Sequence, residues 1–184
     1  MLVKTRAEAM ESAAHKRPGG MAAVIGLGRD QVVELAHRSG LDLANDNAPG
    51  QLVLSGTDRG LDAAAGMVSS EGGRIVRLDV SGPFHTAAMD PAARELGIAI
   101  EATDVRSPSI PVLSNLTARP YRAPGEIRRL LVDQVNHPIR WRECIEWLWA
   151  QGVREFTDLG PGRVVEGLVK RTLRGMEVSV AGDR

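Results

Sequence analysis

Hydrophobic and polar positions along the first eighty residues change their spacing several times. Four segments have an apolar run or an alternation of apolar and polar residues, and we predict strands there, at 21–25, 41–44, 51–55 and 74–80. Helical spacing separates the first strand from the second, over 29–38, and the third from the fourth, after Thr57 as the predicted N-cap. Residues 45–50 are rich in turn formers and are predicted to link the second and third strands. The order β-α-β-β-α-β is the ferredoxin-like pattern, so we predict a small subdomain over 19–81.

The pattern differs on both sides of this subdomain. Residues 2–14 contain good helix formers and no breaker, which predicts a helix of a larger subdomain within 1–18. After Gly82 and Pro83, helices and short strands alternate as in part of a parallel α/β sheet, so 82–184 is predicted to be the C-terminal part of that larger subdomain. The predicted helices span 87–102, 126–136, 141–150 and a segment from the 160–162 turn to Arg174, and the predicted strands span 108–113, 154–159 and 176–180.

Composition narrows the class of protein. The chain has 184 residues, 43% of them hydrophobic, which is enough to bury a core. Its 23 basic and 23 acidic residues balance, which argues against a general nucleic-acid binder. The single cysteine, Cys144, excludes a disulfide scaffold and is expected to be a small buried apolar residue. Because no apolar run is long enough for a membrane span or a signal peptide, we expect a cytoplasmic protein without membrane contact.

Two polar positions are candidates for chemistry. His85 follows a strand and a Gly-Pro turn and immediately precedes a helix, where a side chain can point into a cleft. A single histidine in such a place is more often structural than catalytic, so the pattern leaves both interpretations open. Gln134 lies either on the buried face of the 126–136 helix, holding another polar group, or at the helix end as a cap. No Gly-x-Ser-x-Gly sequence occurs, so no nucleophile elbow can be placed.

Six stretches together resemble the malonyl-CoA:acyl carrier protein transacylase family, which includes acyltransferase domains of polyketide synthases. They are 20–27 (GMAAVIGL), 44–56 (ANDNAPGQLVLSG), 80–89 (VSGPFHTAAM), 111–115 (PVLSN), 133–141 (DQVNHPIRW) and 159–171 (LGPGRVVEGLVKR). They follow the order and spacing of the family over nearly the whole chain. The resemblance implies an α/β fold, in which part of an α/β-hydrolase-like acyltransferase core carries an inserted ferredoxin-like small subdomain.

The resemblance also implies a reaction and its residues. In this family a serine attacks the malonyl thioester of coenzyme A, and the acyl group then passes to the phosphopantetheine thiol of acyl carrier protein. His85 matches the general base, and Gln134 matches the glutamine whose backbone carbonyl orients it. Arg6 matches the arginine that pairs with the malonyl carboxylate, although Ala7 replaces the glycine that usually follows. Phe84, directly before His85, resembles the residue found in members of the family that take malonyl rather than methylmalonyl groups. No cofactor is expected, because the coenzyme A thioester is itself the substrate.

One part of the family pattern is absent, since the chain begins beyond the serine elbow and the N-terminal oxyanion loop. We therefore expect 1–184 to be inactive alone and to expose apolar surface, as a transacylase that is either truncated or supplied with its serine by a separate N-terminal half. The alternatives are a non-catalytic fragment or acyl-carrier or subunit-binding module, and an acyltransferase of polyketide synthesis or of malonate decarboxylation.

Overall fold

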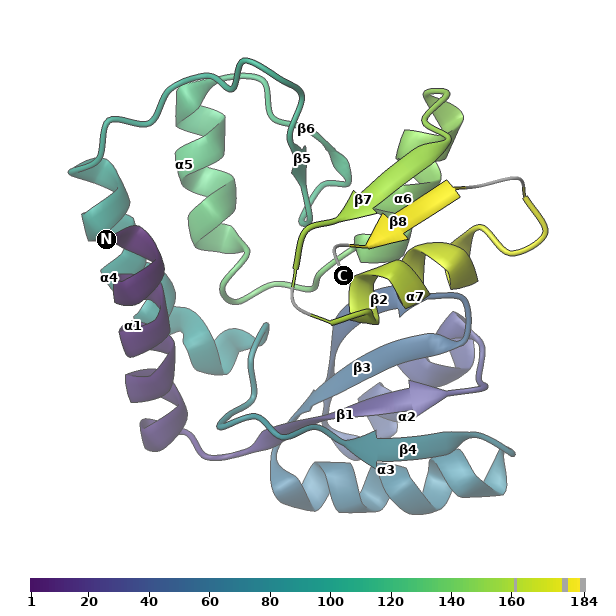
Figure 1. Ribbon diagram of the computed structural model, residues 1–184. Helices are drawn as coiled ribbons and strands as arrows, with labels where there is room; N and C mark the ends of the chain where they lie inside the picture. Colours follow the sequence, from purple (N-terminus) through teal and green to yellow (C-terminus); the bar gives the residue numbers. More distant parts are fainter. Residues whose placement is uncertain (161, 177–178, 183–184) are drawn as a thin grey trace.

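The computed structural model describes residues 1–160, 162–176 and 179–182 (Figure 1). The chain begins with helix α1 (Leu2–Lys16), which buries a stripe of small side chains and Met10 against helix α4 (Asp90–Glu101). The observed α1 is two residues longer than the predicted helix over 2–14, and it ends just before Pro18. Within the described residues, no helix has the length and apolarity needed to cross a membrane.

Residues 20–77 form a four-stranded antiparallel sheet with two helices. The strands are β1 (Gly20–Ile25), β2 (Asp42–Ala48), β3 (Gln51–Gly56) and β4 (Arg74–Arg77), in the spatial order β2-β3-β1-β4. The helices are α2 (Arg29–Ser39) and α3 (Asp58–Ser70), and both contribute to one core with β1 and β3. The predicted order β-α-β-β-α-β is therefore confirmed, and the Thr57 hydroxyl caps α3 by accepting a hydrogen bond from Gly60 N–H.

Side chains alternate across this sheet as the strand period requires. Val24 and Leu54 belong to the core beneath α2 and α3, whereas Met21 and Val53 pack on the opposite face against Phe84. The second face of the sheet is thus turned toward the segment that carries the candidate site residues.

Two strand boundaries in this unit differ from the sequence prediction by more than one residue. The predicted 45–50 turn is wrong over its first four residues, because β2 continues to Ala48 with two register irregularities. These turn-forming residues stay extended because β2 pairs with β3 on one side and with Ile139 on the other. The predicted strand over 74–80 ends at Arg77, the last residue in register with β1, although Leu78 N–H still donates to the Met21 carbonyl.

The second unit is mainly helical, and its helix α4 packs against α1. The 3-10 turn η1 (Ala87–Met89) leads into α4, and α5 (Pro124–Asp133) lies beside α4. A single helix over 87–102 was predicted, but Pro91 occupies the first turn of α4, so the α-helix begins only at Asp90. The predicted 108–113 strand is reduced to β5 (Leu113–Ser114), paired with β6 (Arg119–Pro120), because Pro108 and Pro111 have no N–H for a ladder.

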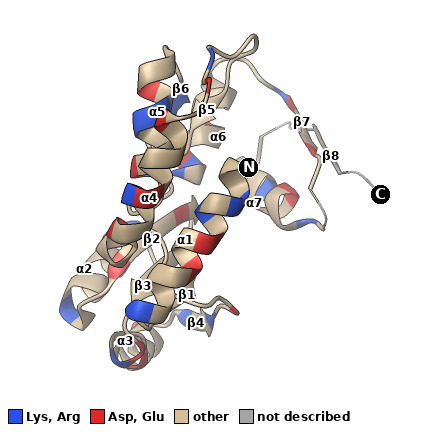
Figure 2. Cartoon of the chain, turned by 90° about the vertical axis from the view of Figure 1, so that its left-hand side faces the viewer, with Lys and Arg blue, Asp and Glu red and all other residues tan. Residues whose placement is uncertain are grey.

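The C-terminal part adds helix α6 (Trp141–Ala150), strand β7 (Glu155–Asp158), helix α7 (Val164–Thr172) and strand β8 (Ser179–Gly182). Strands β7 and β8 pair in parallel, as the α/β pattern predicted. The predicted strand over 176–180 overlaps β8 only in part, and residues 177 and 178 lie outside the described residues. Figure 2 shows acidic and basic residues interspersed over α1, α4 and α5, in keeping with the zero net charge.

Candidate active site

The loop that carries His85 is held tightly against α1. Gly82 and Pro83 are buried, and a Cβ atom on Gly82 would lie 2.4 Å from the Cβ of Ala14. The Thr86 hydroxyl donates to the Pro83 carbonyl at 2.8 Å and accepts from Ala88 N–H, which closes the loop onto η1. His85 itself adopts a φ of 61°, a left-handed conformation that costs free energy for a residue with a Cβ and therefore needs this support.

The His85 ring is oriented by the end of α5. Its Nδ1 lies 2.9 Å from the backbone carbonyl oxygen of Gln134, the C-cap residue of that helix. A carbonyl oxygen can only accept, so Nδ1 carries the proton of the neutral imidazole and Nε2 keeps its lone pair. Of the two interpretations of Gln134 left open by the sequence, the helix-end position is correct, and the group that acts on His85 is the backbone.

The surroundings of His85 favour the neutral base. Burial lowers the pKa of His85 most, the hydrogen bond to the Gln134 carbonyl opposes this, and the positive charge of Arg6 lowers the pKa further. With a pKa below its ordinary value of 6.5, the imidazole is neutral at physiological pH and its Nε2 can accept a proton.

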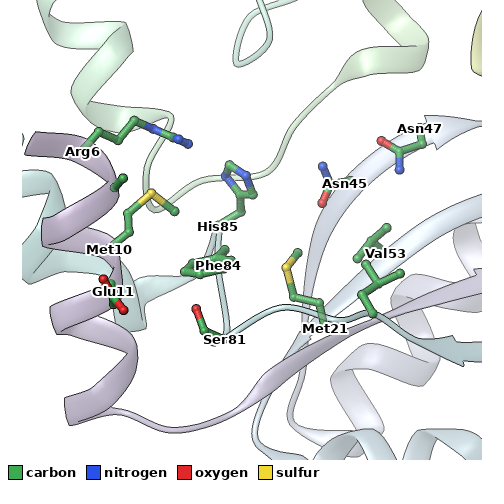
Figure 3. A pocket seen from close by; sticks show the side chains of 12 residues that line it. Arg6, Met10, Glu11, Met21, Asn45, Asn47, Val53, Ser81, Phe84 and His85 are labelled. Carbon is green, nitrogen blue, oxygen red and sulfur yellow. The ribbon is translucent and has the colours of Figure 1, made fainter. Parts of the chain in front are cut away.

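A cavity of about 600 Å³ lies between α1 and the second face of the sheet, and His85 forms part of its wall (Figure 3). Arg6 points into it from α1 with its guanidinium directed toward His85, and Phe84 lies at its base. Within the part of the chain that the structure describes, Arg6 takes part in no ion pair. A guanidinium without a carboxylate partner in a half-apolar cavity is suited to bind an anionic group in a forked geometry.

Besides Arg6 and His85, the cavity is lined by the side chains of Glu11 and Ser81 and by two amides, none of which the sequence analysis singled out. Asn45 and Asn47 extend from β2 into the cavity opposite Arg6 (Figure 3). They were assigned to a turn, but their spacing of two is the signal that could have found them, because residues two apart on a strand share a face. The cavity thus offers two amides, one guanidinium, one imidazole, one carboxylate and one hydroxyl around an apolar floor that includes Met21 and Val53.

A second cavity of about 660 Å³ also borders His85 and lies on the other side of β2, between that strand and the segment before α6. The structure therefore brings Arg6, Phe84, His85 and the Gln134 carbonyl together, although they come from three separate parts of the sequence. Their catalytic and binding roles stay predictions.

Comparison with known proteins gives a consistent class. No model of a protein family matches the chain. It is 37% identical over 187 residues to the malonyl CoA-acyl carrier protein transacylase of Bacillus subtilis, covering 98% of this chain and 59% of that protein. It is 38% identical over 181 residues to the polyketide biosynthesis malonyl CoA-acyl carrier protein transacylase PksC of the same organism, covering 96% of this chain and 62% of that protein.

Solved structures agree. The transacylase from Clostridium perfringens superposes with a TM-score of 0.93 at 33% identity, over 99% of this chain and 58% of that one. A malonyl-transacylase solved in complex with a type II polyketide acyl carrier protein superposes with a TM-score of 0.92 at 32% identity, over 99% of this chain and 60% of that one.

The relatives that share the fold and the sequence of this chain are thus acyltransferases. Within that class, the chain is homologous over nearly its whole length to the malonyl-CoA:acyl carrier protein transacylases. It spans about 60% of the length of these relatives.

Proposed function

We propose that this chain supplies the base and the carboxylate-binding group of a malonyl-CoA:acyl carrier protein transacylase in fatty acid biosynthesis. The observation that carries the proposal is the pairing of His85 Nδ1 with the Gln134 carbonyl at 2.9 Å beside a cavity that contains Arg6. This pairing makes Nε2 the basic atom of a ring that faces the site. The homologous transacylases support the choice of substrate.

The reaction runs in two displacements. His85 Nε2 takes the proton of a serine hydroxyl as its oxygen attacks the malonyl thioester carbonyl, and the imidazolium returns the proton to the departing coenzyme A sulfur. The phosphopantetheine thiol of acyl carrier protein then gives its proton to Nε2, attacks the acyl-serine ester and restores the serine hydroxyl. Arg6 holds the malonyl carboxylate by two hydrogen bonds, while Phe84 limits the space next to it. No cofactor is required.

We propose further that the serine lies on a segment matching the part of the relatives not covered here, carried by this protein or by a separate N-terminal half. Support comes from two observations. The chain matches about 60% of the length of its relatives, and apolar side chains are exposed within residues 82–184, including those of Ile110, Val112, Leu159 and Val164. Such side chains are expected where another polypeptide segment packs.

The two structural units of the chain can be assigned to the two subdomains of the transacylase fold. We propose that 19–81 is the ferredoxin-like small subdomain, supported by the sheet order β2-β3-β1-β4 and its two helices. Residues 1–18 and 82–184 are proposed to belong to the α/β-hydrolase-like core, supported by the parallel pair β7 and β8. A cytoplasmic location, with malonyl-CoA and acyl carrier protein as partners, belongs to the same proposal.

A transacylase of polyketide synthesis is the second candidate, favoured by the 38% identity to PksC. The two candidates share the chemistry of the site and differ in the carrier protein that accepts the malonyl group. The non-catalytic module remains the alternative that an activity test must exclude.

The test is reconstitution of the chain with a serine-bearing segment, followed by incubation with labelled malonyl-CoA and with carrier proteins of both pathways. We expect labelled acyl-protein and then labelled carrier. His85→Ala should reduce transfer by roughly 10²–10⁴-fold, the usual contribution of a general base. His37→Ala, on the exposed end of α2, serves as the matched control and should leave transfer unchanged. Undiminished transfer by His85→Ala would overturn the proposal.

Arg6→Ala addresses the substrate separately. The variant should have a higher KM for malonyl-CoA and should accept acyl groups without a carboxylate, because the cavity no longer contains a guanidinium that binds the carboxylate. Arg38→Ala, an exposed arginine of α2, is the control. Retained selection for malonyl-CoA in Arg6→Ala would remove Arg6 from the site.

A further inference from the structure

The outer edge of β2 is joined to the chain segment that precedes α6. Ile139 N–H donates to the Ala44 carbonyl and Asp46 N–H donates to the Ile139 carbonyl, both at 2.8 Å. The sheet therefore continues by one residue beyond its edge strand, in a parallel bridge between Asn45 and Ile139. These two hydrogen bonds add to the packing of Phe84 on Met21 and Val53, which also holds the second unit of the chain against the sheet.

An ion pair reinforces this junction. Both oxygens of Asp46 accept hydrogen bonds from Arg142 on α6, from Nε and Nη2 at 2.9 Å each, and Arg29 Nε approaches the same carboxylate at 3.4 Å. The Asp46 side chain is 6% exposed and that of Arg142 25%, so this forked pair is largely shielded from water. It joins residues 96 positions apart. The other ion pairs with a carboxylate of the four-stranded unit, those of Arg77 with Asp58 and Asp62, are exposed.

The junction lies between the two halves of the candidate site. Asn45 and Asn47 flank Asp46 on the strand and face the cavity, while Asp46 faces α6. On the other side, Ile139 follows Gln134 by five residues in the segment that orients His85. A shift of β2 relative to α6 therefore moves the amides of the cavity and the Gln134 carbonyl relative to each other.

We propose that Asp46 and Arg142 are positioning residues whose ion pair fixes the sheet against the 134–139 segment, and with it the Gln134 carbonyl against His85. The inference rests on the proposed function only in taking His85 as the base. Its structural content, the orientation of the His85 ring, can be measured in the isolated chain.

The experiment follows the side-chain nitrogens of His85 by NMR in the ¹⁵N-labelled chain, above the pKa of the ring. The wild-type protein should show the tautomer protonated at Nδ1, because the Gln134 carbonyl accepts from that atom. Asp46→Asn keeps the size of the side chain but removes its charge. We expect the signal to move toward a mixture of the two tautomers. Asp62→Asn removes an exposed carboxylate on α3, which pairs with Arg77 at the edge of the sheet opposite β2, and should leave the His85 signals unchanged.

Arg142→Lys provides the second variant, since it keeps the charge and loses the fork. It should shift the tautomer in the same direction by a smaller amount, and it decides the question if Asp46→Asn does not fold. Folded variants that keep the wild-type tautomer would overturn the positioning role. A reconstituted enzyme in which His85→Ala retains full transfer would instead overturn the proposed function and leave the positioning result standing.

Discussion

Replacing Gly82 by alanine tests whether the loop that carries His85 is fixed by its contact with α1. The added Cβ would lie 2.4 Å from the Cβ of Ala14 and 3.3 Å from its Cα. Neither atom can rotate away, because both are attached rigidly to a helix backbone that is buried at this point. Since φ of Gly82 is not positive, the alanine backbone itself is unstrained and the effect is purely one of space.

The expected cost follows from overpacking. Forcing one methyl group into a packed contact typically destabilises by about 1–3 kcal/mol. For a chain of this length that corresponds to a fall in Tm of roughly 2–12 °C. Ala14→Gly alone should cost about 1 kcal/mol, because glycine weakens a helix interior. In the double variant the methyl group of residue 82 occupies the space vacated at residue 14, so the combined cost should fall below the sum by 1 kcal/mol or more.

Urea unfolding of the four proteins, followed by circular dichroism, measures this coupling. The His85 nitrogen signals provide a second readout, because displacement of the loop should weaken the contact with the Gln134 carbonyl in Gly82→Ala and restore it in the double variant. A Gly82→Ala protein as stable as the wild type, or additive costs in the double variant, would refute the reasoning.

Four further outcomes follow from the same structure. Burial lowers the pKa of His85 in the folded protein, so the contribution of His85 to the free energy of unfolding should be complete above pH 6.5, its ordinary pKa, and be lost as the pH falls through the folded pKa. His85→Gln should remove this component from the curve of stability against pH. A variant curve identical to that of the wild type would contradict the argument. Arg6→Gln should raise the pKa of His85 in an NMR titration, and an unchanged pKa would show that the two groups do not interact. Burial raises the pKa of the Cys144 thiol to about 11, so iodoacetamide at pH 8 should label this thiol far more slowly in the folded chain than in the urea-unfolded chain. Equal labelling rates in the two states would contradict this expectation. The isolated chain should bind a hydrophobic dye at its exposed apolar side chains, and a cooperatively melting monomer without dye binding would argue against this.

Local patterns were sufficient to predict structure where an element depends on residues that are close to one another in the sequence. The period-2 and period-3.6 spacings over 20–77 predicted the order of strands and helices, and Thr57 marked the start of α3 because its hydroxyl serves a neighbour three residues away. Boundaries failed where a distant segment supplied hydrogen bonds, as in β2, whose turn-forming residues are held extended by β3 and Ile139. The resemblance to the transacylases added Arg6, Phe84, His85 and Gln134, which spacing alone could not join.

The sequence by itself thus determined the order of the strands and helices, since this order depends on side chains within a few positions of one another. The contact of the Gln134 backbone carbonyl with His85 was implied by the resemblance, but only the tertiary structure decided it, because the partner of a carbonyl depends on how α5 and the 82–86 loop pack. The tertiary structure also decided that Asn45 and Asn47 face the cavity while Asp46 faces Arg142, since the groups that a strand side chain meets depend on what packs on each face of the sheet.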